Sequence, residues 1–150
     1  MDAARGRRSY ASTSQNMGTG ELRAAYLQVG DHPQRGNVLI GDIAVLRADD
    51  FQERGTIGYC MGKAWWGKSI MTEALSEVLR YCFEEVGFFR IDGEHAAENI
   101  GSSRVMEKCG LVYEGTRRKF FRPPTTGKRV DIVDRGILRE EYFNKRQNFN

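Results

Sequence analysis

The sequence of 150 residues contains few cysteines and histidines and no long apolar run. Its three cysteines, Cys60, Cys82 and Cys109, and its two histidines show no spacing typical of a metal site, so we predict neither disulfides nor a bound metal. No apolar stretch approaches the roughly 20 residues that span a bilayer. The first residues, "MDAARGRRSY", contain no apolar segment that could serve as a secretory signal, and we expect a cytoplasmic protein.

Length and charge limit the remaining classes of protein. A chain of 150 residues, 40% of them hydrophobic, can form one compact domain and is too short for two, so we predict a single domain over residues 1–150. The net charge of +3 is too small to imply a nucleic-acid partner. The segment "RRKFFR" at residues 117–122 does interleave basic and aromatic residues, as some nucleic-acid-binding segments do. The favoured interpretation is a half-buried strand with a charged outer face, and we predict no nucleic-acid and no membrane partner.

Hydrophobic patterns predict an α/β (α+β) domain. Turn-forming residues separate apolar segments early in the chain, which indicates three antiparallel strands in a meander. These strands are predicted at residues 22–29, 37–47 and 56–61. Apolar residues then recur at three- and four-residue intervals from Met71 to Val86, and this period predicts an amphipathic helix that ends at Gly87.

The second half of the chain alternates again between strand and helix patterns. Residues 88–95 are predicted as a strand, and Asn99 is predicted to cap a short helix that ends at Gly110. Two final strands, at residues 111–121 and 129–138, are separated by "RPPTTGK", whose prolines and glycine predict a hairpin loop.

The segment "GKAWWGKS" at residues 62–69 separates the third strand from the first helix and matches the phosphate-loop pattern G-x-x-x-x-G-K-[ST]. A phosphate-loop NTPase also needs a mostly parallel sheet with several crossovers after the loop, whereas this chain ends in a predicted hairpin. Trp65 and Trp66 also stand where a backbone that wraps a triphosphate favours small residues. Backbone N–H groups at a helix N-terminus still bind phosphate well, so we expect a ligand that contains a phosphate or pyrophosphate.

Several segments occur in an order and at spacings that are specific as a set. They are "IGDIAV", "IGYCMG" followed by "WWGKSIMTEAL", "FFRIDGEHAAENIGSSRVMEKCGL", "YEGTRR" and "VDIVDRGILREEY". With them the chain, from about residue 22 to residue 142, resembles the GNAT superfamily of N-acetyltransferases. It is most similar to the branch that includes the ribosomal-protein N-terminal (Rim-type) acetyltransferases. The resemblance implies a mixed, mostly antiparallel central sheet flanked by helices.

The resemblance also implies a site for acetyl-coenzyme A as cosubstrate. In the family, the loop before the first helix holds the pyrophosphate, and the strand before the loop lines the pantetheine. The residues that would contact the cosubstrate are Met61, Trp66, Gly67, Lys68, Ser69, Ile70, Met71, Asn99 and Arg104. The loop departs from the family pattern at Ala64, where Gln or Arg is usual, and at Ser69, where Gly or Ala is usual.

Acetyl transfer from a thioester to an amine needs a polarised carbonyl, a proton for the leaving thiolate and a neutral amine. A backbone N–H near Cys60 or Met61 would polarise the carbonyl. The family often protonates the thiolate with a tyrosine whose place here is close to Met106, which cannot donate. By the resemblance Ser102 takes over this role and Asn99 binds the pantetheine amides from the same turn, although capping of a helix would also explain both residues.

The sequence offers three candidates for the base, Asp42, Glu94 and Asp131, each of which could instead be a surface carboxylate. At pH 7 roughly a tenth of an α-amino group is neutral, against fewer than about one lysine amine in a thousand. We therefore favour a protein or peptide N-terminus as acceptor, and otherwise a small amine, with direct attack on the thioester. The alternative is a remnant of the fold that binds coenzyme A or a partner without catalysis.

The segment ahead of the first predicted strand is short compared with the family. Members usually begin with a strand and two helices, whereas 21 residues precede Leu22. We therefore expect the first strand and first helix to be absent. Residues 3–15 would be a remnant of the second helix, or residues 1–21 would be poorly ordered. The strand at residues 22–29 would then be an open edge with one charge and no proline. Since open edges tend to pair with other chains, we predict a homodimer or a larger homo-oligomer.

Overall fold

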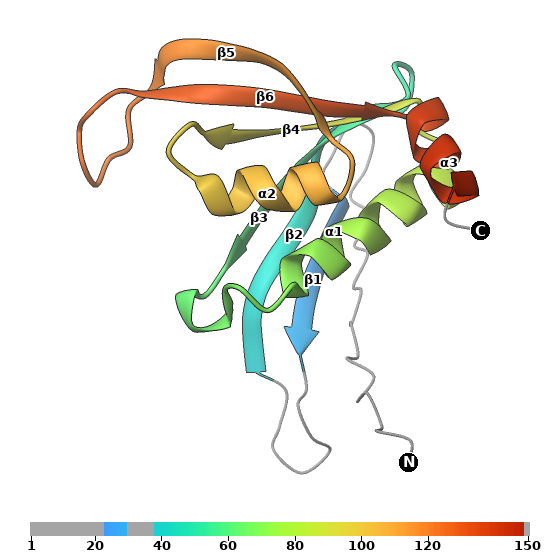
Figure 1. The fold of residues 1–150 in the computed structure, drawn as a ribbon, viewed down its shortest axis with the longest axis horizontal. Helices are drawn as coiled ribbons and strands as arrows, with labels where there is room; N and C mark the ends of the chain where they lie inside the picture. The colour runs from blue at the N-terminus through green and yellow to red at the C-terminus, as the bar shows by residue number, and fades with distance from the viewer. Residues whose placement is uncertain (1–22, 30–37, 149–150) are drawn as a thin grey trace.

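The computed structural model describes residues 23–29 and 38–148 (Figure 1). Its six-stranded sheet has the order β1-β2-β3-β4-β6-β5, in which β3 and β4 are parallel and the other neighbours are antiparallel. The strands are β1 (Arg23–Val29), β2 (Val38–Asp49), β3 (Arg54–Met61), β4 (Arg90–Ala96), β5 (Val112–Phe121) and β6 (Val130–Leu138). The predicted fold class, a mixed and mostly antiparallel sheet with helices, is confirmed. The predictions for residues 1–21 lie outside the described residues.

The helices follow the predicted order, with two additions, a short 3₁₀ turn before the first helix and a helix at the end of the described residues. They are η1 (Lys63–Trp65, one 3₁₀ turn), α1 (Ile70–Arg80), η2 (Tyr81–Val86, a π-helical continuation), α2 (Ile100–Lys108) and α3 (Arg139–Asn148). Gly87 ends the α1 and η2 segment in the left-handed conformation, with φ of 81°. No helix in the described ranges has the length and apolarity needed to span a membrane.

The sequence pattern did not predict α3, because most of its side chains are charged or polar. Its Tyr142 stacks on Phe83 with ring centroids 5.0 Å apart, and the Tyr142 hydroxyl donates to Glu84 Oε1 at 2.7 Å. Helix α3 is therefore held by contacts with η2, which lies far away in the sequence.

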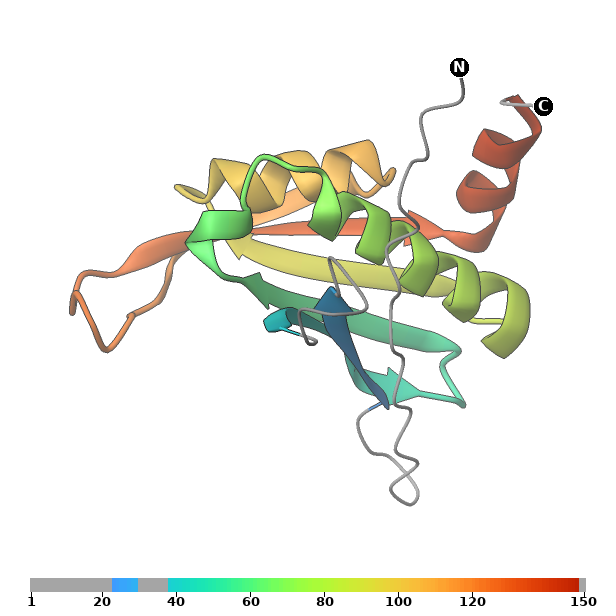
Figure 2. The same ribbon diagram turned by 90° about the horizontal axis from the view of Figure 1, so that it is seen from below.

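The core lies between the sheet and the two helices α1 and α2, which cover the same face (Figure 2). The side chains that fill it are less than 3% exposed and come from both layers, namely Ile43, Ile57, Ile91 and Ile137 from strands and Leu75, Leu79 and Met106 from helices. Alternate residues of β3 and β4 point to the opposite face of the sheet. They include Arg54, Arg90, Asp92 and Glu94, so the face away from the helices carries charged side chains.

The hairpin of β5 and β6 extends beyond the end of β4 (Figure 1). We expected a half-buried strand at residues 117–122, and this expectation is wrong. Phe120 and Phe121 are 56% and 48% exposed, and the exposure of β5 does not alternate along this stretch. The register with β6 shifts between Arg117 and Phe121, and Lys119 adopts a left-handed φ of 52°. Because this bulge breaks the two-residue period, neighbouring rings both face solvent.

Gly41 of β2 is a position where the close approach of two strands requires glycine. A Cβ atom there would lie 2.5 Å from the Cys60 carbonyl oxygen and 3.0 Å from the Met61 Cα atom. We predict that Gly41→Ala lowers the free energy of unfolding by about 1–3 kcal/mol, because the backbone of β3 must move. Urea denaturation measures this change.

The matched control is Gly115→Ala in β5, where an added Cβ would meet no atom within 4 Å. Equal unfolding midpoints for Gly41→Ala and Gly115→Ala would contradict the close approach of β2 and β3.

Candidate functional site

A gap opens in the sheet where β3 and β4 stop pairing. The parallel register runs from Arg54 opposite Arg90 to Ile57 opposite Gly93, after which β3 stays with β2 and β4 stays with β6 (Figure 1). Gly62 N donates to Ile40 O at 2.9 Å. In an antiparallel pair every second residue of a strand directs its backbone groups at its neighbour, so Gly62 and Cys60 bond towards β2. By that alternation the backbone groups of Tyr59 and Met61 face away from β2, into the gap.

The backbone of Met61, rather than that of Cys60, is therefore the donor available in the gap. Cys60 N donates to Asp42 Oδ1 at 3.3 Å on the β2 side. The Met61 carbonyl accepts a 2.8 Å hydrogen bond from Trp66 Nε1, so the indole ring of Trp66 lies at the end of β3. Trp66 is 59% exposed.

The loop after β3 places the N-terminus of α1 beside the gap. Gly67 and Ser69 both adopt left-handed conformations, with φ of 73° and 59°. The first hydrogen bond of the helix runs from Glu73 N to Ser69 O, and the Ser69 side chain makes no capping bond. The helix thus leaves the N–H groups of Ile70 to Thr72 without intrahelical acceptors, and they carry the positive end of its dipole.

The predicted cosubstrate residues of this loop lie together, but they differ in how they can contact a ligand. Ile70 and Met71 are only 2% and 3% exposed, so their side chains offer almost no surface to a ligand. Lys68 is exposed, and its ammonium lies 5.1 Å from the centroid of the Trp65 ring.

The N-terminus of α2 borders the gap from the side of β4. Asn99 Oδ1 accepts from Ser102 N at 3.1 Å, so the predicted helix cap is confirmed, and the Asn99 side-chain amide keeps its two N–H donors. Ser102 is half-buried and Arg104, on the same helix, is exposed. Met106 is 2% exposed and belongs to the hydrophobic core, which places it among apolar side chains.

Tyr59 joins the two sides of the gap, a role that sequence reasoning missed. Its hydroxyl donates to the Ser102 backbone carbonyl at 3.1 Å. Burial raises the pKa of Tyr59 to about 12, so the hydroxyl keeps its proton at any physiological pH. The available signal was the position of Tyr59 in β3, in phase with the buried Ile57, which places its ring on the helix-covered face.

A buried polar network anchors α2 to the sheet and was also missed. Arg135 of β6 donates to His95 Nε2 at 3.2 Å, to Ser103 Oγ at 3.0 Å and to Glu107 Oε1 at 2.7 Å. His95 Nε2 must accept from the guanidinium, so the ring proton is on Nδ1, which donates to the Ala96 carbonyl at 2.8 Å. The network fixes the helix that carries Asn99 and Ser102.

The three candidate bases lie in different surroundings. Asp42 is exposed in β2 opposite Cys60, and the Cys60 thiol donates to its Oδ1 at 3.2 Å, which raises the pKa of Cys60. Glu94 is paired with the guanidinium of Arg117 and lies 3.9 Å from that of Arg47. The Asp131 carboxylate accepts from Lys119 N at 2.8 Å and so supports the bulge of β5.

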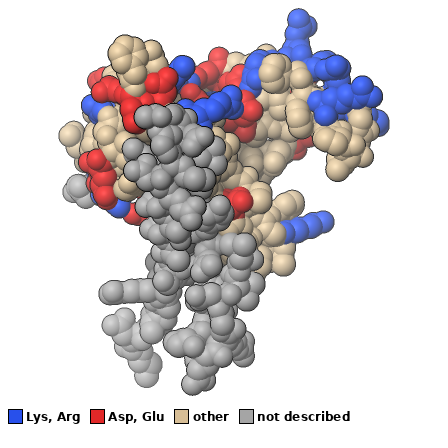
Figure 3. All heavy atoms as spheres, turned by 180° about the vertical axis from the view of Figure 1, so that it is seen from behind, with Lys and Arg blue, Asp and Glu red and all other residues tan. Residues whose placement is uncertain are grey.

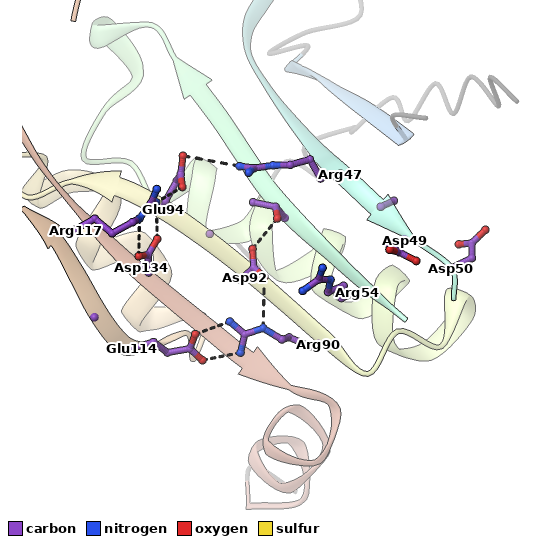
Figure 4. Close-up of a pocket in the computed structure, with 14 residues that line it drawn as sticks. Arg47, Asp49, Asp50, Arg54, Arg90, Asp92, Glu94, Glu114, Arg117 and Asp134 are labelled. Atoms are coloured by element: carbon purple, nitrogen blue, oxygen red, sulfur yellow. Dashed lines mark hydrogen bonds and ion pairs between the residues drawn. The ribbon is translucent and has the colours of Figure 1, made fainter. Parts of the chain in front are cut away.

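A hollow of about 1140 Å³ occupies the face of the sheet away from the helices and reaches Gly93 and Glu94 beside the gap (Figure 4). Several of its charged side chains are paired with one another. Arg90 binds both oxygens of Glu114, which lowers the pKa of that carboxyl, and Arg117 binds both oxygens of Asp134. The hollow is therefore a polar surface on the open side of the gap, lined by four arginines and six acidic residues.

Comparison with known proteins agrees with this architecture. The acetyltransferase (GNAT) domain family matches residues 3–112. The probable N-acetyltransferase YjcK of Bacillus subtilis (strain 168) is 48% identical over 63 residues, which cover 42% of this chain and 35% of YjcK. The putative ribosomal N-acetyltransferase YdaF of the same strain is 31% identical over 104 residues, or 69% of this chain and 56% of YdaF.

A solved structure described as a probable acetyltransferase superposes with a TM-score of 0.71 at 29% identity, covering 80% of this chain and 63% of that one. This chain thus spans between about a third and two thirds of the length of these three proteins.

We predict that Ser69→Gly stabilises the protein. A left-handed conformation costs a residue with a Cβ atom about 1 kcal/mol, and the Ser69 side chain makes no capping bond that the change would remove. The melting temperature should rise by roughly 2–4 °C, measured by differential scanning calorimetry.

The control is Ser76→Gly in the interior of α1, where glycine should destabilise by about 0.5–1 kcal/mol. A fall in melting temperature for both variants would show that Ser69 is not strained.

We predict that Tyr59→Phe lowers the free energy of unfolding by about 0.5–1.5 kcal/mol, because the bond to the Ser102 carbonyl is lost. The effect of Tyr59 also depends on pH. An unfolded tyrosine ionises near pH 10, before the folded Tyr59, so its stabilising contribution is present below about pH 10 and is lost as the pH rises towards 12.

Denaturant titrations at several alkaline pH values test this dependence, with the exposed Tyr113→Phe as control. The stability of Tyr59→Phe should fall less steeply above pH 10 than that of the parent chain. Parallel curves for the parent and both variants would contradict the burial of the Tyr59 hydroxyl.

Proposed function

This chain belongs to the acetyltransferase (GNAT) domain family, and we propose that it transfers an acetyl group from acetyl-coenzyme A to a primary amine. The observation that carries the proposal is the gap between β3 and β4, with the N-termini of α1 and α2 at its border. In this proposal the gap admits the thioester arm, and the unused N–H groups of α1 bind the pyrophosphate.

The cosubstrate would contact three groups of residues. Gly67, Lys68, Ser69, Ile70 and Met71 would hold the pyrophosphate, mainly through backbone N–H groups. Trp66 and Met61 would line the arm, with the Asn99 amide N–H groups donating to its carbonyls. Arg104, exposed on α2, would reach the nucleotide phosphate.

The reaction would be a direct attack of the amine nitrogen on the thioester carbonyl carbon. Met61 N–H would stabilise the developing oxyanion because it faces the gap. As the carbon–sulfur bond breaks, the Ser102 hydroxyl would give a proton to the thiolate and would regain a proton from solvent. Tyr59 would keep the first turn of α2 in place through its bond to the Ser102 carbonyl.

Asp42 is the base that we propose to accept the proton lost by the amine. Glu94 is held by two guanidinium groups and Asp131 supports the bulge, whereas Asp42 is exposed beside the last residues of β3. An exposed carboxylate is a weak base, which suits an α-amine better than a lysine. We therefore propose a protein or peptide N-terminus as acceptor, as the Rim-type resemblance implies.

We also propose that the protein is cytoplasmic and forms a homodimer or larger assembly. β1 is the terminal strand in the order of the described sheet, and we propose that its outer side pairs with another chain.

The base assignment predicts the effect of one substitution. Asp42→Asn should lower kcat for a peptide acceptor about 100-fold, because general-base assistance is removed, while the affinity for acetyl-coenzyme A measured by calorimetry stays the same. Turnover is followed by the loss of thioester absorbance. Glu94→Gln and Asp131→Asn are the matched controls, and a larger loss in either would transfer the assignment to that residue.

The second candidate, a non-catalytic binder of coenzyme A, gives a different result in the same experiments. Such a protein would bind acetyl-coenzyme A with measurable heat yet release no thiol above background hydrolysis with any amine or peptide. Absence of binding at millimolar acetyl-coenzyme A would contradict both candidates.

A further inference from the structure

The end of the β5 and β6 hairpin gathers cations on a surface that projects from the rest of the chain. We call the basic hairpin the seven exposed residues Arg118, Lys119, Phe120, Phe121, Arg122, Lys128 and Arg129. Seen from behind, lysine and arginine side chains concentrate over this hairpin (Figure 3). The net charge of +3 for the whole chain conceals this local excess.

Most of these cations have no carboxylate partner among the described residues. Within the described part of the chain, Lys119 is the one of the five cations that forms an ion pair, with its Nζ 4.0 Å from Asp131 Oδ1. Arg122 and Arg129 instead donate to backbone carbonyls of the hairpin itself, at Gly127 and Lys119. An uncompensated cluster of this kind attracts a polyanion.

The two phenylalanines are held outward by the local backbone. Asp131 Oδ1 accepts from Lys119 N and Arg129 donates to Lys119 O, so both backbone groups of the bulge residue are bound by side chains at the start of β6 and just before it. The bulge is thus a stabilised feature, and it keeps both rings exposed.

Phe120 is also ordered by a stacking contact. The Arg117 guanidinium lies 4.0 Å from the centroid of the Phe120 ring and is itself fixed by two bonds to Asp134. The ring is still 56% exposed, so it offers surface to a planar ligand at little cost in side-chain ordering.

We propose that the basic hairpin binds single-stranded nucleic acid, with phosphates on its cations and bases stacked on Phe120 and Phe121. Proteins bind single strands through this combination of positive charge and exposed aromatic rings. An acidic peptide would satisfy the cations and leave both rings without a function. A membrane would meet the loop at residues 122–128 first, which carries no large apolar side chain.

The proposal departs from the sequence-based expectation of no nucleic-acid partner, because that expectation relied on the overall charge and on a half-buried strand. It does not depend on acetyl transfer, so either proposal can fail alone.

The test is fluorescence anisotropy of the full chain with labelled oligouridine and oligothymidine of about ten nucleotides. Affinity should fall with salt between about 50 and 200 mM, with a logarithmic slope up to about −3.5 if all five cations bind phosphates. Preference for one oligonucleotide would identify RNA or DNA as the source, and equal binding would support recognition of either strand. No binding at low salt, or binding independent of salt, would overturn the proposal.

Variants separate charge from stacking. Arg118→Gln and Lys128→Gln should each reduce the magnitude of the salt slope by about 0.7. Lys108→Gln, which removes one charge from α2, should leave the salt slope unchanged. Phe120→Ala should weaken binding at least about fivefold, whereas Phe51→Ala, at a 91% exposed ring in the turn between β2 and β3, should leave it unchanged. Equal effects of hairpin and control variants would refute the assignment.

Competition identifies the other classes of partner. The competitors are oligoglutamate and vesicles of phosphatidylcholine and phosphatidylserine, each added at a charge concentration equal to that of the oligonucleotide. Displacement by oligoglutamate would make an acidic peptide the partner, and displacement by vesicles would make a membrane the partner. Either result would show that the proposal is wrong. Circular dichroism and thermal melting of each variant show whether it is folded, and these surface changes should leave both unchanged.

Discussion

The candidate site depends on the divergence of β3 and β4 after Ile57 and Gly93. Each strand keeps its other neighbour, so the gap opens without loss of the sheet on either side. Packing supports the last pair, because a Cβ at Gly93 would come within 3.0 Å of both Ile57 and Met106. Glycine at this position lets α2 approach the sheet where the gap begins, and beyond it β3 and β4 no longer pair.

Both helices that border the gap are held by polar contacts on their inner sides. Cys109 Sγ of the α2 cap donates to Thr72 O at 3.4 Å, which connects α2 to the first turn of α1. The Arg135 network and the Tyr59 hydroxyl connect α2 to β6, β4 and β3. These bonds lie partly out of water and are geometrically specific, so they fix the N-terminal turns of both helices where hydrophobic packing alone would let them slide.

Local sequence signals predicted most of the elements, and the tertiary contacts explain the rest. Apolar periodicity found α1, and the Asn99 cap and the Gly110 stop defined α2, because these signals depend on near neighbours. Helix α3 escaped because Tyr142 is anchored by Phe83 and Glu84, far away in sequence. The loop residues predicted for the candidate site are contiguous and form a local pattern, whereas Tyr59 and Arg135 act across elements and show no local pattern.

The exposed hairpin illustrates a different limit of sequence reasoning. Alternation of residue types predicts alternate burial only while a strand keeps its register, and the bulge at Lys119 interrupts the register in the middle of "RRKFFR". Charge is likewise informative only once its placement is known. Carboxylates and arginines are interspersed in the hollow on the sheet, where Arg90 and Arg117 are already paired. The cations beyond the bulge lie outside that network, so a chain with a small net charge presents a strongly basic surface at one end.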